Sequence, residues 1–259
     1  MDIPHVYQIV YVTPNSFTPA PAPSPSSVLP SDSTLGYLTK QESIAVHGVP
    51  NLTIRSLLDN QQFYDPDDAA LDLGISSAFW SLFGLLWPSG SHLAERIALR
   101  PVNAQERILE IGCGLALSSL VGHRRGANIT ASDCHPLAGA FLKENLRLNH
   151  LAPMTYKHGH WGQHNDQQQD ATVDSKFDLI IGSDILYERD ELGDLAHYIN
   201  DHMEDHAEVW VVDPNRGNRA HFHRNMAAQG FTLSEETLKI AATDGEAAYQ
   251  GRMLTYSRD

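Results

Sequence analysis

Arg107-Ile-Leu-Glu-Ile-Gly-Cys-Gly-Leu-Ala-Leu117 is the stretch of sequence that decides the fold. Its first five residues are mostly aliphatic, as is typical of a strand that is covered on both faces. Gly112 and Gly114 allow the backbone to turn sharply and to approach a ligand closely. A helix is predicted over residues 115–125, with its free N–H groups pointing at that ligand. The strand, the glycine turn and the helix together indicate a nucleotide-binding element.

Leu117 distinguishes this turn from the dinucleotide fingerprint, which carries a third glycine at that position. The two glycines alone are equally consistent with a turn that binds no ligand. Two acidic residues favour the interpretation that the turn binds a ligand. Asp133 follows the apolar run over residues 128–132, at the strand tip where an acid accepts both hydroxyl groups of a ribose. Glu110 lies within an apolar strand, where a carboxylate is costly unless it is paired, and so suggests a cationic or donor-rich ligand.

Five motifs in order give the sequence a resemblance to a known family. Leu109-Glu-Ile-Gly-Cys-Gly114, Ser132-Asp133 and Phe177-Asp-Leu-Ile-Ile-Gly-Ser-Asp-Ile-Leu-Tyr187 resemble segments of class I, seven-strand S-adenosylmethionine-dependent methyltransferases. Leu86-Trp-Pro88 and Trp161-Gly162 are similar to two further motifs of the non-SET protein lysine methyltransferases, also called methyltransferase family 16. The resemblance covers roughly residues 53–256, and the set is more specific than any one motif.

The resemblance implies S-adenosyl-L-methionine as the cofactor and S-adenosyl-L-homocysteine as the product. It puts Asp184 and Tyr187 on the substrate side of the cofactor, where Asp184 would orient the acceptor amine and Tyr187 would shape its channel. The residues alone leave open whether this Asp caps the next turn and this Tyr packs in the core. The residues expected at the cofactor are Trp87, Glu110, Gly112, Cys113, Gly114, Asp133, Trp161 and Ser183.

An aromatic block precedes the glycine turn. Trp80 and Phe83 fit a role in the core better than a role at a ligand. In the family that the sequence resembles, the tryptophan of the Trp-Pro motif lies against the cofactor. We expect the same of Trp87, because an indole offers a flat face and one hydrogen-bond donor at the edge of a pocket.

Fourteen histidines raise the question of a metal site. Methyl transfer from a sulfonium needs an aligned, neutral nucleophile and requires no metal. Neither a Cys-x-x-Cys nor a His-Glu-x-x-His motif accompanies the histidines, so no metal site is predicted. The histidines that are close in sequence are His158, His160 and His164, and the pair His202 and His206.

Composition bears on the class of protein. A chain of 259 residues is enough for one large domain. The net charge of -14 disfavours binding to nucleic acid, which needs a basic face. The sequence has no membrane span, and its N-terminus lacks the basic region of a signal peptide. Cys113 and Cys134 are interpreted as reduced thiols, so a cytoplasmic enzyme is expected. A protein as its substrate is what the resemblance implies.

The chain is expected to consist of a tail and one domain. Residues 1–35 are rich in proline among Ser, Thr and Ala, which favours extended chain over a core. Within them, residues 6–12 have the pattern of a strand that packs on this protein or on a neighbour. Residues 36–259 are expected to form the methyltransferase domain with an N-terminal extension. Residues 157–174 are expected to contain a solvated loop. Residues 213–216 are expected to form a plain turn, with substrate binding as the alternative.

Strands and helices are expected to alternate along the domain. Such units imply a mostly parallel sheet with helices on both faces and the ligand at the carboxyl ends of the strands. With the resemblance, the expected fold is α/β, a Rossmann-like, doubly wound sheet of seven strands. Ser89 or Ser91 is expected to cap the first helix. Strands are expected at residues 53–58, 107–111, 128–132, 154–157, 177–181, 208–212, 231–238 and 252–256, and helices at residues 91–99, 115–125, 136–149, 190–202 and 218–229.

The expected function is the transfer of methyl groups from S-adenosylmethionine to a lysine side chain of a protein. An arginine or histidine side chain, or a small amine, remains open as the acceptor, as does the oligomeric state. A non-catalytic module that binds the cofactor or a partner protein is a second alternative. The intact Asp133, Trp161, Asp184 and Tyr187 argue against it. A nicotinamide oxidoreductase is disfavoured by Leu117.

Overall fold

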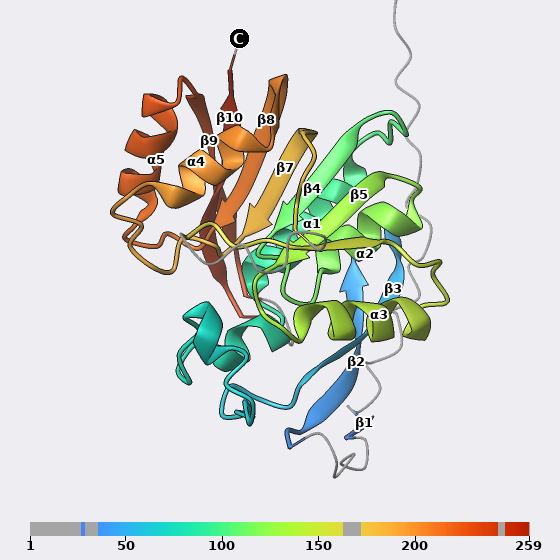
Figure 1. The fold of residues 1–259 in the computed structure, drawn as a ribbon. Coiled ribbons are helices and arrows are strands. Elements are labelled where there is room, and N and C mark those ends of the chain that lie inside the picture. Colours follow the sequence, from blue (N-terminus) through green and yellow to red (C-terminus); the bar gives the residue numbers. More distant parts are fainter. Residues whose placement is uncertain (1–26, 29–35, 163–171, 243–246, 259) are drawn as a thin grey trace, which may run out of the picture.

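A seven-stranded sheet lies at the centre of the protein (Figure 1). The structure is a computed structural model that describes residues 27–28, 36–162, 172–242 and 247–258. Four parallel pairings join five neighbouring strands, and the last two strands in the order are antiparallel to their neighbours. The spatial order is β6 (Thr155–His158), β5 (Asn128–Asp133), β4 (Arg107–Ile111), β7 (Phe177–Ser183), β8 (Met203–Asp213), β10 (Tyr249–Ser257) and β9 (Thr232–Ile240).

Helices cover both faces of the sheet. They are α1 (Pro88–Leu99), α2 (Leu117–Arg124), α3 (Ala138–Leu148), α4 (Asp194–Asp201) and α5 (Arg219–Ala228). Successive residues of a strand point to opposite faces. Ile108 of β4 packs in a core cluster with α1, α2 and α3, whereas Leu109 and Ile111 pack in a second cluster with α4 and α5. The expected α/β, doubly wound and mostly parallel fold is confirmed.

The order of the strands reverses between β4 and β7. The chain runs outward from β4 to β5 and β6, and then returns to β7 and β8 on the other side of β4. In open α/β sheets, ligands bind outside the carboxyl ends of the strands at such a point. The fold therefore brings the glycine turn after β4, Asp133 at the end of β5 and Asp184 after β7 to one edge of the sheet.

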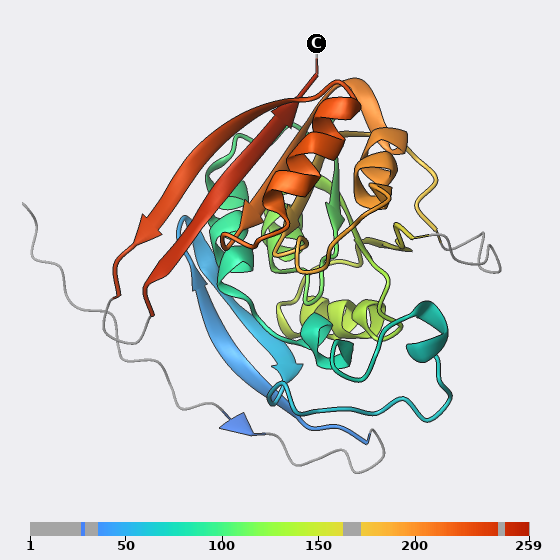
Figure 2. The same cartoon turned by 90° about the vertical axis from the view of Figure 1, so that its left-hand side faces the viewer.

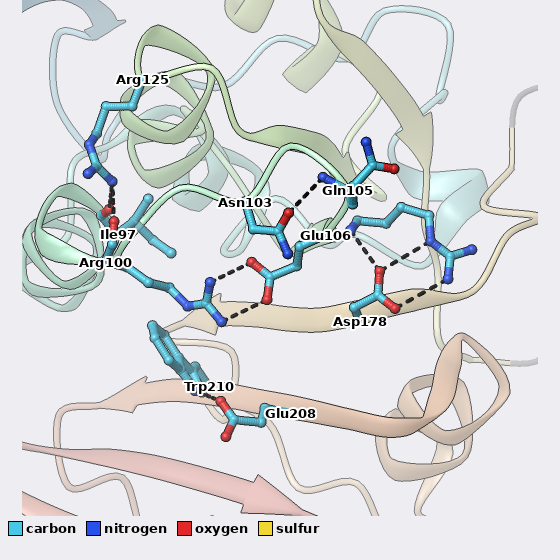
Figure 3. Close-up of polar contacts among 10 residues, drawn as sticks. Ile97, Arg100, Asn103, Gln105, Glu106, Arg125, Asp178, Glu208 and Trp210 are labelled. Atoms are coloured by element: carbon cyan, nitrogen blue, oxygen red, sulfur yellow. Dashed lines mark hydrogen bonds and ion pairs between the residues drawn. The ribbon is translucent and has the colours of Figure 1, made fainter.

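Polar contacts hold the opposite edge, where the strands begin (Figure 3). Arg100 follows α1 and binds both carboxylate oxygens of Glu106, with Nη2 lying 2.7 Å from Oε1. Arg125 donates to the carbonyl oxygens of Ile97 and Arg100, each at 2.7 Å. These bonds satisfy carbonyl groups that the end of α1 leaves without a helical partner. They stabilise the fold far from the carboxyl edge of the sheet.

A β-hairpin packs beside α3 (Figure 2). Its strands β2 (Thr39–Val46) and β3 (Val49–Leu57) are antiparallel, and β1 (Ser27–Val28) pairs with β2. We expected only one strand here, over residues 53–58. The first strand was missed because β2 is largely polar and only Val46 in it is buried. Without alternation of apolar and polar residues, the sequence gives no strand signal.

The start of α1 differs from the expectation. The helix begins at Pro88, which suits the first helical position because proline lacks an N–H group. Neither Ser89 nor Ser91 caps it, because Trp87 occupies the N-cap position. The hydroxyl group of Ser89 instead lies 3.0 Å from that of Tyr249 on β10.

The start of α4 also differs. The helix begins at Asp194, four residues later than expected. The carboxylate of Asp190 accepts hydrogen bonds from the N–H groups of Asp194 and Leu195, each at 2.9 Å. Asp190 therefore caps the helix from outside instead of forming its first turn.

Three expectations fall on parts of the chain that are not described. The expected strand at residues 6–12, most of the expected tail and residues 163–171 of the expected loop lie outside the described residues, as does His164. Among the helices that the structure describes, none has the length and apolar character needed to cross a membrane.

Candidate active site

One cavity of about 870 Å³ opens at the carboxyl edge of the sheet. It is lined by the glycine turn after β4, the end of β5 and the segment after β7, together with two short helices, η1 (Leu71–Leu73) and η2 (Trp80–Gly84). The structure brings to this cavity all ten residues that the sequence indicated. They are Trp87, Glu110, Gly112, Cys113, Gly114, Asp133, Trp161, Ser183, Asp184 and Tyr187.

The backbone requires both glycines of the turn. Gly112 and Gly114 have φ angles of 56° and 52°, in the left-handed region that disfavours residues with a Cβ atom. A Cβ atom on Gly114 would lie 2.8 Å from the carbonyl oxygen of Phe83. One on Gly112 would lie 2.9 Å from Ile185 and 3.3 Å from the ring of Trp161. Neither position of the turn therefore has room for a side chain.

Asp133 ties together two turns at this edge. Its Oδ2 accepts a hydrogen bond from the N–H group of Gly114, and its Oδ1 accepts one from that of His135, each at 2.8 Å. The residue is 6% exposed, and burial raises the pKa of its carboxyl group. Each carboxylate oxygen can accept a second hydrogen bond. Asp133 can therefore hold both turns and still accept hydroxyl groups from a ligand.

Glu110 is paired within the chain. Its Oε2 accepts hydrogen bonds from the hydroxyl group of Ser119 and, at 2.8 Å, from the backbone N–H group of the same residue. The residue is 3% exposed, and burial raises the pKa of its carboxyl group to about 7. The sequence suggested a cationic or donor-rich ligand as the partner of this carboxylate. Ser119, near the start of α2, supplies donors from within the protein.

Two tryptophans present ring surface to the cavity. Nε1 of Trp87 donates to the carbonyl oxygen of Leu82 at 2.9 Å, so the donor that we expected to face a ligand is used within the chain. Trp161 lies against Gly112 and contacts Tyr198 edge to face, with ring centroids 6.2 Å apart. Both rings line the cavity. Their contribution to a ligand is therefore apolar.

Asp184 is bound by Arg216, a contact that the sequence does not predict. Its Oδ1 accepts a hydrogen bond from Nε of Arg216 at 2.6 Å and forms an ion pair with Nη2 at 2.5 Å. Its own N–H group donates to the carbonyl oxygen of Val212 at 2.9 Å. We had expected residues 213–216 to form a plain turn. The available signal was the position of Arg216 just after β8, since the neighbouring parallel strands β7 and β8 end at the same edge.

Tyr187 lies at the rim of the cavity. The residue is 39% exposed, and its ring centroid lies 6.0 Å from that of Phe79. Burial raises the pKa of its phenol, so the hydroxyl group stays protonated at neutral pH. The two rings give one side of the rim an aromatic surface.

The two cysteines are free thiols. Burial raises the pKa of Cys113 well above its usual range and that of Cys134 to about 12. Neither is a thiolate at neutral pH, and only a thiolate is an effective nucleophile. In the described ranges, no group of three or more His, Cys, Asp or Glu side chains is placed to hold a metal ion.

Two curated proteins are similar to this chain over part of their length. An electron transfer flavoprotein beta subunit lysine methyltransferase of Danio rerio is 28% identical over 141 residues, which are 53% of this chain and 50% of that protein. The histone-arginine methyltransferase METTL23 of Xenopus laevis is 25% identical over 132 residues, 49% of this chain and 55% of that protein. The chain thus spans about half the length of the curated relatives that it matches.

A solved structure shares the fold. The 16S rRNA N2 G1207 methyltransferase RsmC of T. thermophilus, in complex with AdoMet and guanosine, matches with a TM-score of 0.52 and 16% sequence identity. The match covers 85% of this chain and 51% of that one, and at this identity it concerns the fold alone. A family described as lysine methyltransferase matches residues 79–229, which include all ten cavity residues named above. The chain belongs to this lysine methyltransferase family.

Proposed function

We propose that the protein transfers methyl groups from S-adenosyl-L-methionine to a lysine side chain of a protein substrate. The observation that carries this proposal is the cavity at the carboxyl edge of the sheet. Its ten indicated residues come from five separate parts of the sequence and converge on the point where the strand order reverses. The family match spans the same residues.

The cavity fits the cofactor. Gly112 and Gly114 line the cavity with backbone alone, and Asp133 keeps acceptor capacity for two ribose hydroxyl groups. Trp87 and Trp161 add apolar ring surface. When bound, S-adenosylmethionine supplies a methyl group on a sulfonium: the lone pair of the acceptor nitrogen forms the N–CH₃ bond, the electron pair of the broken S–CH₃ bond goes to sulfur, and the nitrogen then releases a proton to water. The product is S-adenosyl-L-homocysteine.

The substrate side of the proposal consists of Asp184 and Tyr187. In this proposal Oδ2 of Asp184 accepts an N–H group of the amine, and Tyr187 shapes the channel through which the side chain enters. An arginine acceptor is the alternative with direct support, since one relative is a histone-arginine methyltransferase. The pairing of Asp184 with Arg216 favours lysine, because an incoming guanidinium would meet a carboxylate that already binds one.

We extend the proposal to location and partners. A cytoplasmic protein is supported by two free thiols, and a partner other than nucleic acid by the net charge of -14. Residues 1–35 are proposed to act as a tail outside the catalytic domain, attached to it through β1, because their proline content does not suit a core.

Incubation with tritium-labelled S-adenosylmethionine and a lysate of the source cells tests the function. We expect a labelled protein band, with the label on lysine when the band is analysed by mass spectrometry. Label on arginine or histidine, or only in the small-molecule fraction, would replace lysine with that acceptor. In parallel, S-adenosylhomocysteine but not NAD should raise the melting temperature, and the reverse result would remove the cofactor assignment.

A further inference from the structure

Arg216 links Asp184 to the end of β8. Its Nε and Nη2 bind one oxygen of Asp184, Oδ1, at 2.6 and 2.5 Å. The backbone N–H group of Arg216 donates to Oδ2 of Asp213 at 3.0 Å, and Asp213 is 0% exposed. The buried end of the strand thus holds the arginine, and the arginine holds the carboxylate.

Asp184 needs the contact with Arg216 because its backbone conformation is unfavourable. Its φ angle is 58°, a left-handed conformation that residues other than glycine rarely adopt. The bond to Val212 fixes the backbone, and the bonds to Arg216 fix the side chain. Both Asp184 and Arg216 line the cavity. Within the part of the chain that the structure describes, Oδ2 of Asp184 makes no hydrogen bond, so it remains available to a ligand.

The pair also sets the charge at this wall of the cavity. An unpaired carboxylate would attract lysine as its ammonium ion, which has no lone pair with which to attack a methyl group. A guanidinium on Oδ1 opposes that attraction, because the two opposite charges lie in hydrogen-bond contact. The side chains of Asp184 and Arg216 are 10% and 37% exposed, so water screens the pair only in part.

We propose that Arg216 is a positioning residue for methyl transfer that acts through Asp184, an inference that rests on the proposed function. By binding Oδ1 it directs Oδ2 toward the acceptor and offsets the charge of the carboxylate, so that the amine binds in its neutral form. On binding, the lysine ammonium releases one proton to water. One N–H group of the resulting amine then donates to Oδ2, and the nitrogen keeps its lone pair for the methyl group.

Other charged and titratable groups surround the pair. Tyr249 on β10 and Asp213 on β8 interact electrostatically with Asp184, and Tyr187 at the rim interacts with Arg216. Burial raises the pKa of both tyrosines above 10, so neither changes charge between pH 7 and 9. Arg219 interacts electrostatically with Asp213. Glu188 and His221 line the same cavity.

Proton release on acceptor binding tests the inference. The probe is a synthetic peptide that spans the lysine labelled by the wild-type protein in the lysate, titrated into protein loaded with S-adenosylhomocysteine. Calorimetry at pH 7.5 in buffers of different ionisation enthalpy counts the protons. We expect about one proton per peptide for the wild type, clearly fewer for Arg216→Gln, and a value near the wild type for Arg216→Lys, since lysine keeps the charge.

Turnover gives a second readout. At pH 7.5 we expect kcat of Arg216→Gln to fall about ten- to a hundredfold without a rise in KM, as when a positioned charged group is lost from the transition state. The rate should recover toward that of the wild type as the pH is raised to 9, because more of the bound amine is then neutral. Arg216→Lys should keep the pH profile of the wild type.

Arg100→Gln is the matched control, because it breaks an arginine–carboxylate pair with Glu106 at the opposite edge of the sheet. It should lower the melting temperature and leave proton release unchanged. If Arg216→Gln behaves in the same way, Arg216 is only a structural residue and the proposal is overturned. If the wild-type protein labels no lysine at all, the proposed function fails first, and the inference fails with it.

Discussion

Glu110 links the folding of this protein to pH. Its carboxyl group has a pKa of about 7 in the folded protein, against 4.5 for the free group, because burial disfavours the charged form. Between these values the native state holds a proton that the unfolded state has lost. The contribution to stability is fully present below pH 4.5 and is lost as the pH rises through 7.

Replacing Glu110 with Gln removes this titration and keeps an oxygen that can accept the N–H group of Ser119. We compare the free energy of unfolding of the wild type with that of Glu110→Gln. The wild-type value should fall relative to the variant by on the order of 3 kcal/mol as the pH rises from 4.5 to 8. Urea denaturation of both proteins across this range measures the difference. A difference that does not change with pH would mean that Glu110 is ionised in the folded protein throughout.

At the residue scale, the local sequence predicts which positions belong to the site. It does not predict which residues their side chains contact. Gly112, Gly114 and Asp133 follow from the pattern of strand, turn and strand end. The partner of Glu110 is nine residues away and that of Asp184 is 32 residues away. The first contact depends on how α2 packs against β4 and the second on the order of the strands in the sheet. The sequence of either partner alone does not reveal them.

At the element scale, α3 binds the hairpin as a neighbouring strand would. Asn149 accepts from the N–H group of Thr53 at 2.8 Å and donates to its carbonyl oxygen at 2.7 Å. Asn145 does the same for Arg55, at 2.7 and 3.3 Å. Asn145 lies in α3 and Asn149 caps its C-terminal end four residues later, so both lie on one face and contact alternate residues of β3. Their side-chain amides thereby pair an edge that would otherwise lack partners.

Asn145→Ala should destabilise the protein strongly. The side chain is fully buried, and its loss leaves both the N–H and the carbonyl group of Arg55 without this partner. We expect a loss of about 2 to 4 kcal/mol, because an unsatisfied buried polar group costs roughly 1 to 3 kcal/mol. Thermal unfolding measures it, with Lys143→Ala at an exposed position of α3 as the control. Equal stability of the two variants would show that the amide contacts do not anchor the hairpin.

Some helices and strands were predicted more closely than others, because their apolar patterns differ in strength. Strands β4 and β7 are buried on both faces and read as continuous apolar runs, so their positions were predicted closely. The polar strand β2 was missed, although it completes the hairpin that α3 anchors. The start of α4 was placed too early because Asp190 resembles a first-turn residue, whereas it acts as an external cap.

At the scale of the whole molecule, the winding of the chain assembles the site. Two layers of helices enclose the sheet, and the reversal of strand order leaves the carboxyl edge open between them. The sequence predicted this architecture because each strand–helix unit carries its own pattern and a glycine turn marks the first one. It did not predict that η1 and η2, which lie before the first predicted helix, would supply a wall of the cavity.

The last prediction concerns how much of the chain the cavity needs. Among the residues that the structure describes, those that line it all fall between Leu73 and Phe222, so a chain that begins at residue 27 should bind S-adenosylhomocysteine as well as the full chain does. At a ligand concentration of about 100 times Kd, both should gain about 2.7 kcal/mol of stability. A chain that begins at residue 36 also loses β1, which pairs with β2, so we expect a lower melting temperature but the same gain from the ligand.

Calorimetric titration and thermal unfolding of the three chains provide the comparison. Loss of ligand binding on removal of residues 1–26 alone would mean that this segment completes the site, and the proposal that residues 1–35 are a tail outside the domain would then be wrong.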